Sequence, residues 1–379
     1  QSFPRIMGSG SPFKTKQNRI DIRETISLCI AAYFAFPLLR NVIEVMGELA
    51  NSEIVLSGGN KKTKDFIRAW FKKIGLRTLS GCFFREYFRS ANCFIYRMDG
   101  KMSSGEMKKM TQVYGSEGNA LTSTIPVAYR ILNPETITAG GSYSLNNTIY
   151  YKTLSAYEAA QFDKLSKKEI NSQLGKSANV LDNGGQKDIQ LDPKNLTVLL
   201  YKAQPYESFG IPFAHGVLED IEAKMEMKRL DLSIARTTER ALLHIKVGET
   251  ATEHNKGSNI NPNTIAALQG LFNNSSVSRT LITDFTVDAD WLIPDLQKIL
   301  GPQKYEQLNK DISVGLNAVI FDTSDSFSNS SIKLQIFLDR LKEARADFID
   351  NFLQNEIINV CRGIGAKNYP KASFSEISL

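Results

Sequence analysis

The chain has 379 residues, of which 42% are hydrophobic and 23% charged, and it carries a net charge of +6. This composition describes a folded protein with a substantial core, and it excludes collagen-like repeats, a disulfide scaffold and wholesale disorder. The four cysteines form no CxxC pair and the three histidines show no HxxH spacing, so no metal or cofactor is expected. Cys29 and Cys82 stand in apolar surroundings, which predicts buried, reduced thiols.

The charge is spread unevenly along the sequence. Residues 1–110 hold 19 Lys and Arg against 9 Asp and Glu, whereas the remaining residues hold 27 against 31. A basic N-terminal part is typical of a nucleic-acid surface, and it equally fits a face that pairs with an acidic neighbour in an oligomer. The longest uncharged apolar run, residues 25–39, is shorter than the ~20 residues that a membrane span needs, so we expect a buried helix there.

After an irregular arm at 1–20, the first 210 residues predict one mixed α+β domain. Two helices are expected at 21–36 and 37–50, because Pro37 would disrupt the interior of a single helix. Residues 63–75 carry an aromatic stripe beside basic residues, and at helical spacing this pattern favours a core face over a nucleic-acid platform. We expect strands at 53–56, 92–97, 127–131, 136–139, 149–153 and 197–201, capping boxes at Ser155 and Ser166, a turn at 99–100 and an exposed loop at 171–190.

The second half of the chain has a different character. Residues 217–241 lack Gly and Pro and predict one helix of roughly 37 Å, which is long for a globular domain. Its expected apolar stripe comprises Leu218, Ile221, Met225, Leu232 and Ala235. Further expectations are strands at 242–247 and 281–287, a helix from Leu292 to Leu316 interrupted at Pro302, a Ser/Asp/Asn loop at 321–331, a long helix at 331–360 and irregular chain at 363–379.

No catalytic constellation emerges from the motifs. Gly175-Lys176-Ser177 ends like a phosphate-binding loop, but Ile170 stands where the first glycine is needed. His244 fits a structural histidine within a strand. Asp288 and Asp290 lack clustered partners for two-metal chemistry. We therefore expect a protein that is not an enzyme; the alternative is a DNA-processing enzyme, a metal-dependent nuclease or recombinase, that uses the basic N-terminal part.

The order of elements and several phrases resemble the portal proteins of tailed bacteriophages. Three of these phrases lie in the first part of the chain, at 22–59, 83–96 and 130–134. The phrase Phe209-Gly-Ile-Pro-Phe213 is similar to the Y-G-x-S-P-L that precedes the first stem helix of that family. Pro212 fits this phrase, whereas Ile211 replaces the small residue. The resemblance covers nearly the whole chain.

The resemblance implies an elongated α+β subunit with a mixed α/β wing, a long helical stem, a small strand-containing clip and a long helix behind a tunnel loop. In this sequence the parts would be an irregular arm at 1–20, the wing at 21–213, the first stem helix at 214–240, the clip at 241–291, the second stem helix at 292–318, the tunnel loop at 319–331, a long channel- or crown-side helix at 332–362 and a wing or crown remnant at 363–379.

The resemblance also implies a function. Twelve subunits would form a ring at one capsid vertex of the virion, assembled in the host cytoplasm without cofactor or membrane. Double-stranded DNA would pass through the ring without sequence specificity during packaging and ejection, and the ring would dock terminase, adaptor and tail proteins and the major capsid protein. A different virion component, such as a capsid or adaptor protein, is the other reading.

The resemblance assigns residues to the channel. The first stem helix would carry Lys224, Lys228, Arg229 and Arg236, and the tunnel loop would expose Asp322, Thr323, Ser324, Asp325, Ser326, Ser328 and Asn329 to the DNA. A conduit should not grip phosphate strongly, because each neutralised phosphate adds salt-dependent affinity. The loop carries no Lys or Arg, which suits this requirement.

Overall fold

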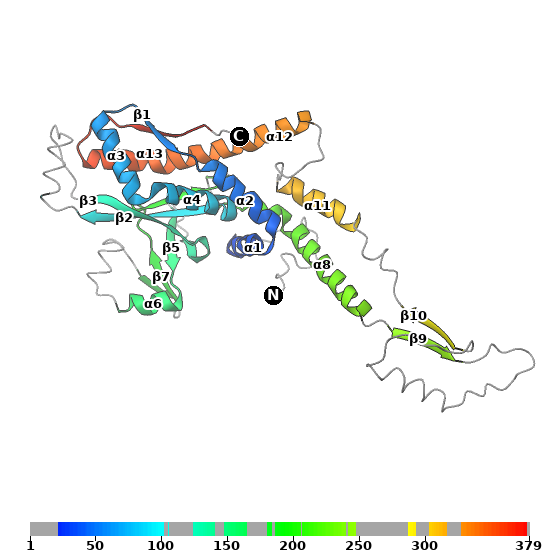
Figure 1. Cartoon of the computed structure of the whole chain (residues 1–379). Coiled ribbons are helices and arrows are strands. Elements are labelled where there is room, and N and C mark those ends of the chain that lie inside the picture. Colours follow the sequence, from blue (N-terminus) through cyan, green and yellow to red (C-terminus); the bar gives the residue numbers. More distant parts are fainter. Residues whose placement is uncertain are drawn as a thin grey trace, which may run out of the picture. The chain divides into compact units, whose positions relative to one another are not determined.

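The computed structural model describes residues 22–101, 105, 124–140, 148–164, 180–183, 186–205, 207–239, 242–247, 287–292, 303–316 and 327–376. The chain divides into two compact units (Figure 1). Unit one combines Gln1–Glu222 with Asn309–Leu379, and unit two is Ala223–Leu308. Helices and antiparallel sheets are both present among the described residues, so the expected α+β class is confirmed.

Two helices joined at a proline open unit one. α1 spans Ile22–Ala35 and α2 spans Pro37–Ala50, as the sequence predicts. Pro37 is the first residue of α2, where its missing N–H breaks no helical hydrogen bond. Among the described helices none is by itself long and apolar enough to cross a membrane; α1 and α2 meet the criterion only as a pair, bent by 98°.

The next two helices meet at Gly75, whose φ of +63° is the left-handed conformation that glycine adopts at little cost. They are α3 (Lys61–Ile74) and α4 (Leu76–Ser90). Ile67 and Trp70 of α3 are buried, and the Trp70 indole Nε1 donates a hydrogen bond to the Pro126 carbonyl at 2.9 Å. The aromatic stripe of α3 therefore belongs to the core, as predicted.

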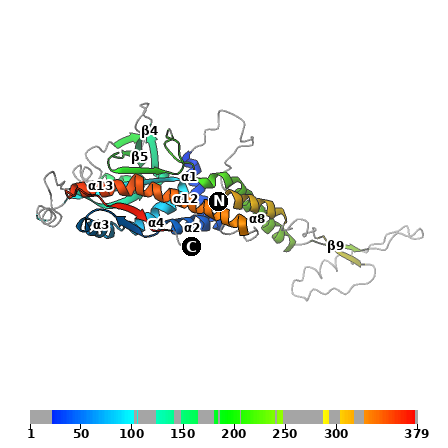
Figure 2. The same cartoon turned by 90° about the horizontal axis from the view of Figure 1, so that it is seen from above.

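Two larger antiparallel sheets of unit one follow in the chain (Figure 2). The first has the order β3 (Thr124–Leu132), β2 (Asn92–Lys101), β8 (Leu196–Leu200). The second has the order β4 (Ile137–Gly140), β5 (Ile149–Thr153), β7 (Gln186–Gln190), β6 (Val180–Asn183). A short 3₁₀ helix, η1 (Pro134–Thr136), leads from β3 into β4. Each expected strand of this region is present.

The predicted turn at Asp99-Gly100 is wrong. Both residues lie within β2, and the register shifts by a bulge between Met98 and Asp99. Gly100 serves a close approach between strands, because a Cβ atom there would lie 2.5 Å from Val127 Cγ1. An Asp-Gly pair marks turns in general, but here the bulge and the tight strand spacing account for it.

The predicted exposed loop at 171–190 is also wrong in its second half. Residues of β6 and β7 pair there as an antiparallel hairpin, and Ile189 is 3% exposed. Both strands are rich in polar residues, so hydrophobic alternation gives little signal, and backbone pairing with β5 holds β7 in the sheet.

Ser155 caps the helix α6 (Ala156–Phe162). Its hydroxyl accepts from the Glu158 N–H, and the Glu158 carboxylate accepts from the Ser155 N–H at 3.0 Å. The capping box predicted here is confirmed. The second predicted capping box, at Ser166, lies outside the described residues.

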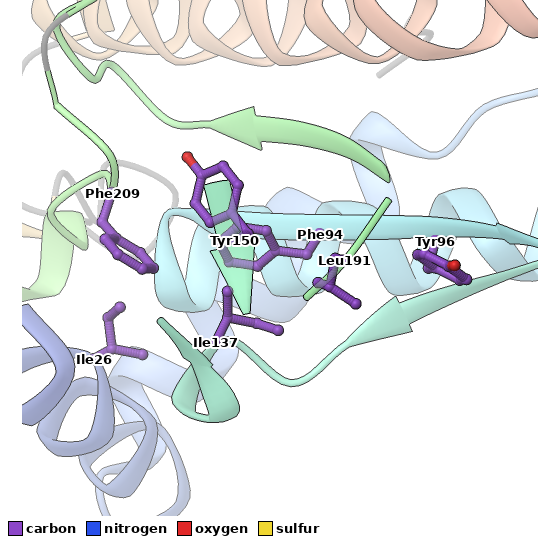
Figure 3. Close-up of a cluster of buried hydrophobic side chains, with 7 residues drawn as sticks. All are labelled: Ile26, Phe94, Tyr96, Ile137, Tyr150, Leu191 and Phe209. Carbon is purple, nitrogen blue, oxygen red and sulfur yellow. The ribbon is translucent and has the colours of Figure 1, made fainter. Parts of the chain in front are cut away.

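An apolar cluster joins the two sheets to the first helix (Figure 3). Ile26 of α1 and Ile137 of β4 are fully buried in it. Aromatic rings supply much of the rest of the cluster. The centre of the Phe94 ring lies 5.3 Å from that of Tyr150 and 5.9 Å from that of Phe209, both in edge-to-face arrangements. Such geometry adds to the stabilisation from burial, and it fixes α1 against the sheets.

A long helical segment and a C-terminal strand close unit one. α12 (Phe327–Phe348), the π-helical turn η4 (Ile349–Leu353) and α13 (Gln354–Gly363) follow one another without a break. The strand β11 (Lys371–Phe374) then pairs antiparallel with β1 (Ile54–Ser57). The expectation of irregular chain at 363–379 is therefore wrong at 371–374, because β1, far away in sequence, provides the pairing partner.

The four cysteines are free thiols. Cys29, Cys93 and Cys361 are buried, and burial raises the pKa of Cys29 and of Cys361 to about 12. Cys82 is exposed, so the prediction that it is buried is wrong. The α4 stretch around it is apolar, but Cys82 itself lies on the exposed side of that helix.

Unit two contains a two-stranded antiparallel sheet. β9 spans Leu242–Val247, as predicted, and pairs with β10, Val287–Leu292. Of the strand predicted at 281–287, only Val287 lies within the described residues, and it is the first residue of β10. Leu292, expected to start a helix, is the last residue of β10. The next described helix is α11, Gln303–Gly315, which begins directly after Pro302.

Candidate functional site

The four cationic residues assigned to the first stem helix all lie on one helix, α8 (Leu218–Glu239), which follows the 3₁₀ turn η2 (Phe213–Val217). The acidic residues Glu219 and Asp220 lie in its first turn, where their negative charges interact favourably with the positive end of the helix dipole. Lys224 is half-buried, and burial, then repulsion by Lys228, lowers the pKa of its ammonium group. The other three assigned residues are exposed: Lys228, Arg229 and Arg236.

The predicted apolar stripe of α8 is buried only at its beginning. Leu218 and Ile221 are 4% and 2% exposed, whereas Leu232 is 59% exposed. Met225 between them is half-buried, and the burial of Ala235 lies outside what the structure describes. The spacing predicts the helix correctly, but within the single chain its later apolar residues meet too few partners to be covered.

Polar and steric contacts hold α8 and α11 together within each unit. In unit two, the Tyr305 hydroxyl of α11 donates to the Asp231 carboxylate of α8, and this bond raises the pKa of Tyr305 to about 12. In unit one, Gly315 of α11 packs so closely that a Cβ there would lie 2.2 Å from Val217 Cγ1. Burial, then the nearby Asp311 and Glu219, raises the pKa of Asp220.

Part of the predicted tunnel loop is helical. α12 begins at Phe327, so Ser328 and Asn329 belong to its first turn, and the prediction of a loop reaching Ser331 is wrong. Serine and asparagine are poor helix formers in the interior but favourable at an N-terminus, which explains the error. The other residues assigned to this loop lie outside the described residues: Asp322, Thr323, Ser324, Asp325 and Ser326.

One buried arginine ties α12 to two distant segments, and the sequence analysis missed it. Arg345 is 7% exposed and donates from Nε and Nη2 to the carbonyls of Ala50 and Leu49, at 2.9 and 2.7 Å. Its Nη1 donates to the Ser375 carbonyl at 3.0 Å. The first two carbonyls end α2, where the helix dipole favours a cation. The available signal was its spacing, four residues after Leu341 and three before Phe348, which are both 0% exposed.

A second buried network joins α13 to the first sheet. The Glu356 carboxylate, 7% exposed as a residue, accepts from Tyr129 OH at 2.5 Å and from Arg97 Nη1 at 3.2 Å. Arg97 also donates from Nη2 to Asn195 Oδ1 at 2.9 Å. Burial, followed by the Glu356 charge, raises the pKa of Tyr129. This network fixes α13 against β2 and β3.

The residues considered for metal or base chemistry lie on the sheet of unit two. Asp288 pairs in register with Lys246, and Asp290 pairs with His244. In the described part of the chain, no group of three or more His, Cys, Asp or Glu side chains is placed to hold a metal ion.

Comparison with known proteins gives matches at the level of structure. No protein-family model matches the sequence, and no curated protein matches it. A chain from the virion of a native gene transfer agent particle has a TM-score of 0.53 at 11% identity, over 97% of this chain and 87% of that chain. A chain from the neck of an empty gene transfer agent particle, computed with C6 symmetry, has a TM-score of 0.52 at 11% identity, over 97% and 88%.

A weaker structural match, with a TM-score of 0.38 at 9% identity, is an HK97 family phage portal protein from Corynebacterium diphtheriae; it covers 92% of this chain and 93% of that chain. The likeness to the gene transfer agent chains extends over almost the whole sequence. The chain thus shares its fold with chains of the virion and neck of gene transfer agent particles.

Proposed function

We propose that the chain is a portal subunit: a structural, non-catalytic component that forms a ring at one capsid vertex. Double-stranded DNA passes through the ring during packaging and ejection, and the ring docks terminase and head-completion or tail proteins. The observation that carries this proposal is the structural likeness to virion and neck chains over 97% of the sequence. The cyclic symmetry named for the neck particle supports a ring.

The described elements supply the parts that such a subunit needs. The mixed helices and sheets of 21–213 correspond to a wing, and α8 and α11 correspond to the two stem helices. The β9–β10 pair lies between them in sequence, as a clip would. A tunnel loop would then occupy residues before Phe327, and α12 with α13 would form the long helix behind it.

The charge of α8 is compatible with a wall along which DNA slides. The helix holds six acidic residues against the four cationic residues assigned above. Each exposed cation that pairs with a phosphate adds salt-dependent affinity, and neighbouring carboxylates reduce it. Asp322 and Asp325, with no Lys or Arg among the residues of 321–331, favour the same weak grip.

The ring is tested by imaging. Purified protein examined by mass photometry and negative-stain microscopy is expected to show a closed ring with one rotational axis and a central channel, with twelve copies as the expected number. Monomers or dimers alone, over a wide range of concentration, would overturn the proposal.

The channel is tested by charge reversal. Asp322→Lys combined with Asp325→Lys is expected to impair genome packaging while ring assembly stays intact, because added cations slow the passage of DNA. The matched control is Glu48→Lys with Glu53→Lys, which reverses two exposed carboxylates of unit one outside the loop. The length of packaged DNA is measured in both. Normal filling in the loop variant would remove the role proposed for this loop.

A further inference from the structure

One side of α1 exposes small residues and an aromatic ring. Ser27, Ala31, Phe34 and Ala35 form this face, which we name the α1 face, and each of them is exposed. The Phe34 side chain is 65% exposed, whereas the adjacent Tyr33 is 3% exposed. An exposed phenylalanine leaves apolar surface in contact with water. Arg23 and Glu24, one turn before Ser27, are exposed on the same side of the helix. An exposed aromatic ring among small and charged side chains is a feature of surfaces that another molecule covers.

Three arginines border the α1 face, and we name them the arginine rim: Arg40, Arg85 and Arg89. The Arg40 and Arg89 guanidinium carbons lie 5.9 and 5.5 Å from the centre of the Tyr33 ring. Arg89 also lies 5.9 Å from the centre of the Phe34 ring. Arg85 is held by Glu44, with Nε and Oε2 3.1 Å apart. Arginine and aromatic side chains dominate the energetics of protein interfaces.

On unit one, α12 presents the opposite charge. Asp339, Glu343, Asp347 and Asp350 recur at intervals of three or four residues, so they share one side of the helical segment, and we name them the acidic stripe. Burial, then Glu343 and Asp350, raises the pKa of Asp347. Two of these carboxylates meet cations of the same chain: Asp339 lies 2.9 Å from Lys342 Nζ, and Glu343 lies 3.7 Å from Lys202 Nζ. The four carboxylates outnumber these two cations, so the surface remains attractive to cations of another molecule.

The two surfaces lie on different sides of unit one. In Figure 1, α1 is below α2 and α4, while α12 is above them. Figure 2, seen from above, shows α1 and α12 in overlapping positions, which agrees with this arrangement. A cyclic ring needs this property, since each copy must offer one surface to the copy before it and a different surface to the copy after it.

We propose that the α1 face and arginine rim of one copy dock on the acidic stripe of α12 of the next copy. This inference rests on the proposed ring, and it names which surfaces close it. The chain's own charge distribution supports a second copy as the occupant, because a basic N-terminal region of 19 Lys and Arg against 9 Asp and Glu stands beside an acidic remainder. A bilayer or DNA covering the α1 face is the competing outcome of the test.

The first experiment places a charge in the centre of the α1 face. Phe34→Glu is expected to raise the concentration for half-maximal ring assembly at least tenfold in mass photometry. The matched control is Tyr157→Glu, which replaces an aromatic residue that is 73% exposed on α6, and assembly is expected to be unchanged. Equal assembly of wild type and Phe34→Glu would overturn the proposal and leave the ring itself standing. Absence of rings in the wild type would overturn the proposed function, and this inference with it.

The second experiment distinguishes a lost interface from a misfolded chain. One variant reverses the rim with Arg40→Glu and Arg85→Glu; another reverses the stripe with Asp339→Lys and Asp350→Lys. Each is expected to fail to assemble alone, because its two surfaces carry like charge. An equimolar mixture is expected to form rings of alternating copies, since every interface then joins opposite charges. Failure of the mixture, with both variants folded by circular dichroism, would overturn the proposed pairing.

Two further measurements address the competing occupants. Flotation with phosphatidylcholine vesicles tests the bilayer, and a mobility-shift assay with a double-stranded DNA fragment tests nucleic acid. The amount of protein that binds vesicles or DNA is expected to be the same for the wild type, for Phe34→Glu and for the variant with the reversed arginine rim. Vesicle or DNA binding that Phe34→Glu abolishes while rings persist would overturn the docking of a second copy in favour of that occupant.

Discussion

The helices α8 and α12 have the same length, 22 residues, but they are buried to different extents. On α12, the residues Phe337, Leu341 and Phe348 are at most 3% exposed. On α8, Leu230 and Leu232 are 62% and 59% exposed. The contrast teaches that an amphipathic pattern predicts whether a helix forms, whereas contacts from distant segments decide how much of it is covered.

The largest expected effect comes from the network that anchors the end of the long helical segment. Glu356→Ala would leave the partly buried Arg97 with Asp99 as its remaining carboxylate partner, and Tyr129 without its acceptor. Removing one partner of a buried ion pair costs about 3–5 kcal/mol. Urea denaturation of the full chain should show this loss as a lower midpoint concentration of urea.

The control for that variant lies on α12. Glu343→Ala removes a carboxylate that lies 3.7 Å from Lys202, with both side chains more than half-exposed. Exposed ion pairs contribute about 0–1 kcal/mol, so its midpoint should move little. Equal losses in the two variants would contradict the distinction between anchored and exposed contacts.

A somewhat smaller effect is expected from Arg345→Met. The thioether fills part of the space, but the carbonyls of Leu49, Ala50 and Ser375 lose their charged donor. Unsatisfied buried polar groups cost about 1–3 kcal/mol, and we expect a loss in this range in denaturant unfolding. Lys342→Met, three residues away and exposed, is the matched control. If the two variants unfold alike, Arg345 does not anchor the segment.

The next prediction concerns the close packing of Gly315 in α11 against Val217, which directly precedes α8. Gly315→Ala would force its Cβ against Val217, and overpacking of this kind costs about 1–3 kcal/mol. The better helix propensity of alanine offsets up to about 1 kcal/mol of this. Combining it with Val217→Ala should remove the clash, so the double variant should lose less than the two single losses added. Simple additivity in denaturation would contradict the close approach.

The smallest effect concerns pH. Burial raises the pKa of Asp347 above its unfolded value, although Tyr87 donates to its carboxylate. The fold therefore favours the protonated carboxyl, and its contribution to stability falls as pH rises from the unfolded pKa of about 3.9 to the raised folded value. Asp347→Asn should remove this dependence in urea midpoints measured from pH 4 to 7. An unchanged slope would show that Asp347 does not cause it.

Local patterns predict the elements that local contacts determine. The boundary at Pro37, the capping box at Ser155 and the core stripe of α3 each follow from neighbouring residues, and each is found. The strand β11 escaped prediction because its partner β1 lies far away in the sequence. The hairpin of β6 and β7 escaped because its polar residues give little hydrophobic alternation. Arg345 escaped for the same reason as β11, since its three acceptors are 30 to 296 residues away. For the candidate site, the sequence predicted which segments are helical and which charges they carry. It did not predict how much of each helix is buried by distant parts of the chain.

The pairing of β1 with β11 bears on how the protein is made. Ser52 and Ser375, which bond beside this sheet, are 323 residues apart. A ribosome that adds about 5–20 residues per second needs roughly 16–65 s to cover that distance. During this time β1 has no partner strand from its own chain, and the end of α2 lacks the cation that later binds it. A nascent or prematurely terminated chain therefore cannot close unit one, which restricts assembly to polypeptides that have been translated as far as β11.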